Sequence, residues 1–199
     1  MSSILKVDEI QDTSGNNIIN ENAGTITIGK SGDTINLASG ATNNLGITQT
    51  DTWRLTATTN GSTNDAITTN WEKSDDPLFG YIGNGLTESS GVFSFPETGL
   101  YYIHYSFCIQ TNDDTSAGVV LQTTDNNSTF ADRGEVYAGA VGASASNHTV
   151  SNANFLNVTD ITNIKFKFKT VSFSTGTSIL GNSSENRSGF SILRIGDTV

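Results

Sequence analysis

The stretch 91-GVFSFPETGLYYIHYSFCIQ-110 decides the fold class of this chain. Two apolar runs flank the turn-forming residues 96–99. The second run alternates with a period of two, which is typical of a strand with one buried face. We expect that face to lie in a hydrophobic core. It comprises Tyr101, Ile103, Tyr105, Phe107 and Ile109.

The other face of the same run is mixed in character. It carries Tyr102, His104, Ser106 and Cys108, a set that is too aromatic for a fully hydrated surface and too polar for a core. His104 and Cys108 are four residues apart, which places them about 13 Å apart along an extended strand. That distance is too long for a nucleophile and its base, so we expect this face to contact a protein partner.

The composition favours many short strands. Of 199 residues, 35% are hydrophobic and 15% are charged, and 20 are Gly. The abundant Ser and Asn compete with the backbone for hydrogen bonds in helices, whereas Thr fits a pleated sheet. Nine strand-like segments separated by turn formers predict an antiparallel sandwich or jelly roll. The segments are 53–59, 66–74, 91–95, 99–110, 117–124, 134–141, 148–158, 163–173 and 188–196.

The charge and the apolar pattern exclude some partners. With a formal charge of −10, the chain lacks the clustered Lys and Arg that phosphate contacts need, so we expect no nucleic acid partner. No window approaches the roughly 20 apolar residues of a membrane span, and the N-terminus lacks the apolar run of a signal peptide. We therefore expect no membrane insertion. One cysteine allows no internal disulfide.

Residues 1–50 differ from the others because they contain no aromatic residue. Short runs with Ile and Leu alternate with Gly, and Thr-Ile-Thr-Ile at 25–28 is followed by Thr-Ile-Asn-Leu at 34–37. Such a segment cannot bury a core alone. It either stays disordered or packs against copies of itself or another protein, and the regular Ile spacing favours packing. We expect two domains, 1–50 and 51–199.

No pattern in the chain indicates catalysis. Neither histidine has a partner at zinc-ligand spacing, and no phosphate loop or nucleophile elbow is present. The pairs Asp75-Asp76 and Asp113-Asp114 do not continue into a calcium loop, which needs six or more oxygen ligands. We expect no enzyme activity, no cofactor and no metal, although calcium binding and a glycosidase-type carboxylate pair stay open. One strand has a basic face that is either solvated or binds an acidic glycan. It comprises Lys165, Lys167 and Lys169.

Three blocks of sequence resemble one family. They are Gly91-x-Phe93-x-x-Pro96-x-x-Gly99-Leu100-Tyr101-Tyr102, 153-ANFLNVTDITNIKFKFK-169 and 187-RSGFSILRIGD-197. Their order and spacing, over about residues 53–199, resemble the head domain of complement component one, subcomponent q, within the tumour-necrosis-factor-like jelly rolls. In the second block, Thr159-Asp160 replaces the family's usual Gly-Asp. The resemblance implies an all-β, antiparallel jelly-roll head of about ten strands that assembles as a homotrimer, and it transfers no catalytic residues.

The same resemblance places the strand at 99–110 and the last strand against the neighbouring subunits. In 188–196, Phe190 and Ile192 fall on one face, whereas the other face also carries aliphatic residues, so this strand is covered on both sides. We expect one face in the sandwich core and the other at a subunit partner. The expected trimer interface comprises Tyr102, His104, Ser106, Cys108, Phe190 and Ile192.

The N-terminal segment resembles a different group of proteins. MSSILKVDEIQDTSGNNIINENAGTITIG is similar to the opening of structural proteins of phages that infect marine bacteria, cyanophages especially. The resemblance implies an extended, β-rich segment that trimerises and attaches to the virion, with the head displayed outward. The expected attachment residues are Ile4, Leu5, Val7 and Ile10.

Together these features predict a trimeric phage tail fibre or knob-type virion protein. We expect it to be made in the host cytoplasm and displayed on the particle exterior. Its N-terminal segment would bind other virion proteins, and its head a host receptor or glycan. The alternatives are a capsid decoration or a tail collar or adaptor protein without receptor binding, and a surface-polysaccharide depolymerase. The candidate receptor-facing residues are Asn112, Asp113, Asp114, Asn126, Asn127, Asn182 and Asn186.

Overall fold

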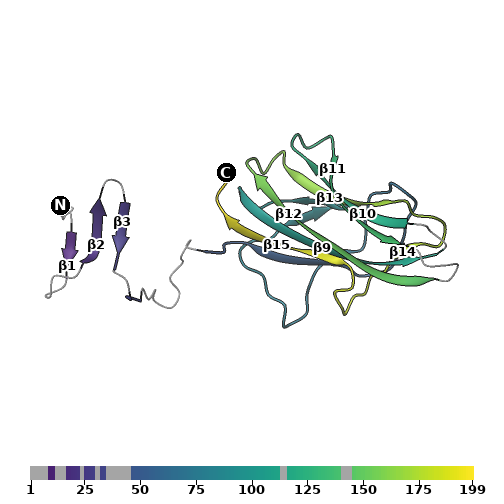
Figure 1. The fold of residues 1–199 in the computed structure, drawn as a ribbon, viewed down its shortest axis with the longest axis horizontal. Helices are drawn as coiled ribbons and strands as arrows, with labels where there is room; N and C mark the ends of the chain where they lie inside the picture. Colours follow the sequence, from purple (N-terminus) through teal and green to yellow (C-terminus); the bar gives the residue numbers. More distant parts are fainter. Residues whose placement is uncertain are drawn as a thin grey trace. The chain divides into compact units, whose positions relative to one another are not determined.

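The computed structural model describes residues 9–11, 17–22, 25–29, 32–34, 46–112, 116–139 and 145–199. All regular elements in these ranges are β-strands (Figure 1). The first eight are β1 Glu9–Gln11, β2 Asn17–Asn22, β3 Thr25–Ile28, β4 Thr50–Leu55, β5 Thr59–Asn60, β6 Trp71–Lys73, β7 Thr87–Ser89 and β8 Val92–Ser94. The others are β9 Gly99–Thr111, β10 Ser116–Thr124, β11 Ala131–Gly139, β12 Ser146–Val158, β13 Lys165–Val171, β14 Ser178–Ile179 and β15 Gly189–Gly196.

The chain forms two compact units, Met1–Asn43 and Asn44–Val199. In the described part of the first unit, β1, β2 and β3 form an antiparallel sheet in that order. Its register aligns Ile10, Ile19 and Ile28 in one exposed row across the three strands. Ile10 is the one expected attachment residue in the described ranges. The other three lie outside them: Ile4, Leu5 and Val7.

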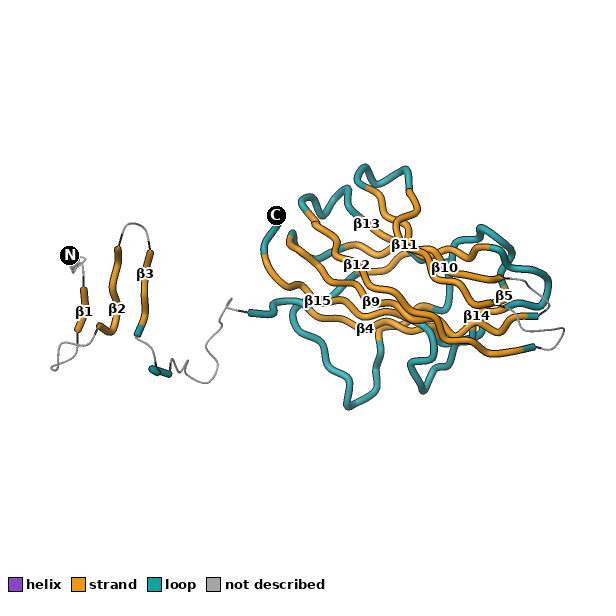
Figure 2. Tube along the Cα trace, in the orientation of Figure 1, coloured by secondary structure: helices purple, strands orange, loops and turns teal. Residues whose placement is uncertain are grey.

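The second unit, which we call the head, is a sandwich of two antiparallel sheets (Figure 2). We call the sheet with the order β11-β10-β13-β8-β7 the five-stranded sheet. The seven-stranded sheet has the order β5-β14-β9-β15-β4-β6, and β12 pairs with the other side of β9. From β8 onward the chain passes repeatedly from one sheet to the other, which confirms the expected jelly roll.

Aromatic side chains fill the space between the sheets. In β13, alternation turns Phe166 and Phe168 inward and leaves the lysines between them outside. Phe93 stacks on Phe166 with ring centroids 5.1 Å apart, and Phe190 meets Phe93 edge-on at 4.7 Å. Such pairs stabilise a core beyond the area that they bury. The core face predicted for β9 is confirmed, because all five residues are fully buried: Tyr101, Ile103, Tyr105, Phe107 and Ile109.

The structure corrects the expected position of Phe190 and Ile192. Both are buried in the sandwich core, so they do not lie on the outer face of the sheet. The reason is the register of β15, which pairs Phe190 with Tyr105 and Ile192 with Ile103. Residues paired across antiparallel strands share a face, so these two side chains lie on the core face of β9.

The segment before β4 belongs to the head. Gln49 accepts a hydrogen bond from the backbone N–H of Arg194 through its carbonyl oxygen, at 2.9 Å. The Thr48 hydroxyl donates to Glu97 at 2.8 Å and receives a bond from the Arg194 guanidinium at 3.3 Å. These contacts hold the chain where it enters the head, beside the corner at 96–99, which explains why the units divide after Asn43 and not after residue 50.

Candidate functional site

The outer face of the seven-stranded sheet carries a row of residues that crosses the whole sheet. The register places Phe155, Tyr102, Leu193 and Thr50 side by side on four successive strands, and Ile82 bridges to Thr50 beyond them. We call these five residues the outer row. The rings of Tyr102 and Phe155 lie 5.4 Å apart, and Phe155 is 65% exposed. An apolar row of this extent on a surface is typical of an interface.

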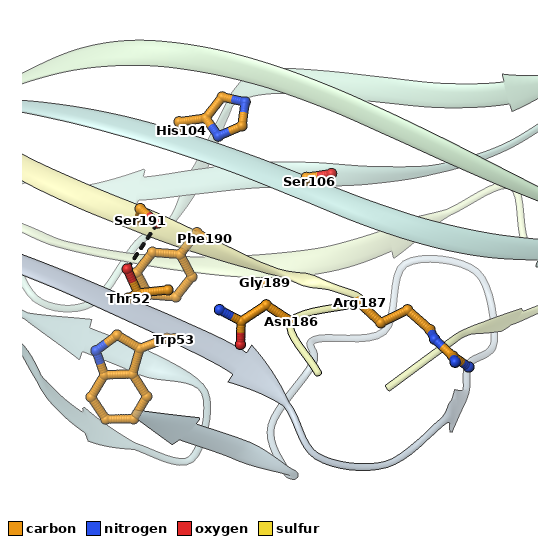
Figure 3. A pocket seen from close by; sticks show the side chains of 9 residues that line it. All are labelled: Thr52, Trp53, His104, Ser106, Asn186, Arg187, Gly189, Phe190 and Ser191. Carbon is orange, nitrogen blue, oxygen red and sulfur yellow. Dashed lines mark hydrogen bonds between the residues drawn. The ribbon is translucent and has the colours of Figure 1, made fainter. Parts of the chain in front are cut away.

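A small polar hollow of about 120 Å³, whose lining residues are drawn in Figure 3, lies next to the outer row. His104 stands at its edge on β9, and the hydroxyls of Thr52 and Ser191 lie 3.0 Å apart on the neighbouring strands. No carboxylate lines it, so the hollow offers no acid–base pair. Hydroxyls and an imidazole can instead form hydrogen bonds with a polar side chain of a partner.

Four of the expected interface residues share this outer face. Tyr102, Ser106 and Cys108 are half-buried and His104 is exposed, as the alternation of β9 predicts. The Cys108 thiol is free, and its backbone N–H donates to the Ser188 hydroxyl at 2.9 Å. Their role at a subunit interface stays a prediction.

The candidate receptor-facing residues do not form one patch. Asn112 follows the end of β9, where its amide donates to the carbonyl of Thr175 at 3.3 Å. Asn126 and Asn127 lie at the opposite end of the head. The Asn127 N–H donates to the carbonyl of Asn163, which follows β12 in the chain, and the last residue of β12 pairs with Gly99 at the start of β9. The 13 residues of β9 separate these ends by about 40 Å.

The other candidate loop residues lie elsewhere. Asn182 and Asn186 belong to the loop before β15, and Asn186 accepts a bond from the Ser74 hydroxyl at 2.9 Å. Asn186 also lines the polar hollow beside His104. Asp113 and Asp114 lie outside the described residues.

Sequence reasoning missed a loop that exposes four large apolar side chains. We call residues 76–82 the apolar loop. Leu78 is 92% exposed, and Phe79, Tyr81 and Ile82 are exposed as well. The signal was Leu-Phe-Gly-Tyr-Ile within a stretch of turn formers, which alternation does not detect because the loop forms no strand.

A groove runs along the edge of the sandwich between β11 and β12. We call it the edge groove. Its volume is about 270 Å³, and a further hollow of about 290 Å³ adjoins it towards Asp125. The Asn154 Oδ1 atom is buried beside it without a hydrogen-bond partner among the described residues. The residues that line the groove are Leu121, Thr123, Arg133, Asn154, Phe155 and Leu156.

The basic face of β13 is largely engaged within the head. Lys167 lies 4.2 Å from the ring centroid of Phe130, and Lys169 pairs with Asp132 at 3.0 Å. Burial alone would raise the pKa of Asp132, but hydrogen bonds from Lys169 and Gln122 lower it overall. Because side chains of the head already engage Lys167 and Lys169, these contacts favour a solvated surface over a binding site for an acidic glycan.

The described residues include no group of three or more His, Cys, Asp or Glu side chains that could hold a metal ion. At the pair Asp75-Asp76, Asp75 is bound to Arg54, and Asp76 accepts the Leu78 N–H at 2.9 Å. No helix in the described ranges is long and apolar enough to cross a membrane.

The sequence matches no protein-family model and no curated protein. Among solved structures, the chain is similar to the Eiger TNF from S. frugiperda. The two share 11% identity, with a TM-score of 0.58 over 77% of this chain and 95% of that chain. The head has a tumour-necrosis-factor-like jelly-roll fold. Murine APRIL at pH 8.5 gives a TM-score of 0.52 at 11% identity, over 73% of this chain and 96% of that chain. At these identities the likeness establishes the fold.

Proposed function

We propose that this chain is a homotrimeric attachment protein of a phage particle. Its tumour-necrosis-factor-like head would bind a receptor or glycan on the host surface, and its N-terminal segment would hold it to other virion proteins. The observation that carries the proposal is the outer row, a set of mostly apolar, exposed or half-buried residues across one face of the head.

The outer row supports assembly through the seven-stranded sheet. Tyr102 and Phe155 form an aromatic pair at one end of the row, and aromatic residues are enriched at the centres of protein interfaces. The polar hollow beside them supplies hydrogen-bonding groups. A homotrimer is the state that the family resemblance of the head implies, and three copies would cover this face.

The two chain units suit an attachment role. The similarity of the N-terminal sequence to structural proteins of marine phages supports a place on the particle exterior. The loops around Asn112 lie about 40 Å along β9 from the point where the chain enters the head, and this favours them over Asn126 and Asn127 as receptor contacts. We propose a binding role without a catalytic step or a cofactor.

Three measurements test the proposal. Sedimentation of the full chain should give a trimer, and a monomer at all concentrations would contradict it. Soluble protein should compete with phage for adsorption to host cells. Imaging of the virion should place the protein on the tail with the head outward, whereas a position in the capsid lattice would favour the decoration protein.

A further inference from the structure

Two complementary surfaces lie on opposite edges of the seven-stranded sheet. We propose that, in the assembled head, the apolar loop of one copy inserts into the edge groove of the next copy. The inference rests on the proposed homotrimer and specifies which surfaces of two copies meet, and in which direction.

The apolar loop is held in place with its side chains outward. The N–H of Phe79 donates to the carbonyl of Asp76, and the N–H of Ile82 donates to the Thr50 hydroxyl, both at 2.9 Å. Lys73 lies 4.6 Å from the ring centroid of Tyr81. A loop that is fixed before binding loses little conformational entropy when a partner covers it.

The edge groove offers an apolar site with one cation. Leu121, Leu156 and Phe155 supply its apolar lining. Arg133 lines it as well and is exposed, and it forms no ion pair with any residue in the described ranges. The adjoining hollow is lined by Arg133 and by one carboxylate, Asp125.

Loop and groove lie at the same level along the strands. The outer row joins Ile82 in the loop to Phe155 in the groove, across four inter-strand spacings, or about 19 Å. A contact between unlike surfaces closes into a ring only when it produces no rise along the axis. Both surfaces lie on one cross-strand row, so neither is displaced along the strands relative to the other. Copies related by rotation about an axis parallel to the strands can therefore meet without a rise, and this favours a closed ring over a filament.

The charges of loop and groove are complementary. Asp76 lies at the start of the loop, two residues before Leu78, and Arg133 lines the groove. A carboxylate beside the inserted apolar side chains would meet the guanidinium of the neighbouring copy. The apolar loop of a second copy carries both the apolar side chains and the carboxylate that the groove would bind. We therefore assign a second copy of this chain as the occupant of the groove.

The first test is the substitution Leu78→Asp in the full chain. Leu78 is 92% exposed in a single protomer, so its replacement should leave the protomer folded. We expect the concentration for half-dissociation of the trimer to rise at least tenfold by analytical ultracentrifugation. The matched control is Ile161→Asp, an exposed apolar residue in a turn outside both surfaces, which should leave assembly unchanged.

The second test reverses the charges of the pair. Asp76→Arg and Arg133→Asp should each weaken the trimer, and the double variant should recover at least part of the loss. A trimer as stable as wild type in Leu78→Asp and in both single charge variants would overturn the inference while leaving the homotrimer standing. Loss of host adsorption without loss of the trimer in Leu78→Asp would overturn it too, because the loop would then face another partner.

Discussion

At the scale of single residues, Asp51 is a carboxylate whose side chain is fully buried. It accepts hydrogen bonds from the indole N–H of Trp53 at 3.0 Å and the backbone N–H of Leu86 at 2.8 Å, and it pairs with Lys73 at 3.1 Å. One side chain therefore joins β4 and β6 to the segment before β7. A buried charge is tolerated when it is fully paired in this way.

We predict that Asp51→Ala lowers the free energy of unfolding by about 3–5 kcal/mol, because it leaves two buried donors and an ammonium group without their acceptor. The control is Asp197→Ala. Its side chain is 95% exposed although it pairs with Arg194, so the loss should stay below about 1 kcal/mol. Urea unfolding of the three proteins measures both values, and equal losses would contradict the role of burial.

Tyr101 makes the stability of the head depend on pH in the alkaline range. Burial, with the nearby Glu97 carboxylate adding to it, raises the pKa of Tyr101 from 10.0 to about 12, and its hydroxyl donates to the carbonyl of Glu97 at 2.9 Å. The fold favours the neutral phenol. The resulting stability is fully present below pH 10 and is lost as the pH rises towards 12, by about 2–3 kcal/mol.

Tyr101→Phe should therefore reduce the loss of stability between pH 10 and pH 12. At pH 7 the variant should lose about 1 kcal/mol with its hydrogen bond. Burial also raises the pKa of Tyr105, but Tyr105 is present in both proteins. The difference in stability between the two proteins therefore reports on Tyr101 alone. Denaturant midpoints at pH 8, 10 and 11 provide the comparison, and parallel pH curves would contradict the assignment.

At the scale of elements, Gly189 sets the spacing between β15 and β4. A Cβ atom at this position would lie 2.0 Å from the carbonyl oxygen of Trp53 and 2.9 Å from the Cα of Arg54. Both neighbours are backbone, so neither can give way by rotating a side chain. The glycine of the Ser188-Gly189-Phe190 sequence is thus required for strand pairing.

Gly189→Ala should destabilise the head by about 3 kcal/mol, because β15 must move away from β4. Gly196→Ala, at the end of the same strand, is the control. No heavy atom lies within 4 Å of its added Cβ, and we expect a change within about 0.5 kcal/mol. Thermal unfolding distinguishes the two variants. An unchanged stability of Gly189→Ala would show that β15 can move away from β4 without a loss of stability.

Alternation predicted β9 and β13 well because each has one clearly apolar face. Alternation could not tell which face of β15 lies in the core, because both faces are apolar in sequence. The pairing of β15 with β9 determines which face is buried. The residues opposite Phe155 in the outer row come from strands far apart in sequence, so no local pattern reveals them. The apolar loop was missed for a different reason, since it forms no strand and alternation therefore does not detect its apolar residues.

At the scale of the whole molecule, the core of the head is self-contained. Every residue of its hydrophobic cluster lies between Trp53 and Ile192. We predict that residues 44–199 alone unfold at the same temperature as the head in the full chain. Differential scanning calorimetry of both proteins tests this, and a lower midpoint for the shorter protein would show that the N-terminal unit stabilises the head.

The attachment of residues 48–49 beside β15 also has a mechanical consequence. If the head is held at the Asn112 end while the chain is pulled at residue 46, tension runs along β4. The hydrogen bonds that join β4 to β15 and β6 lie across that direction, so they are loaded together in shear and not opened one by one. A head built this way resists a pull along its strands better than a sideways pull that peels an edge strand.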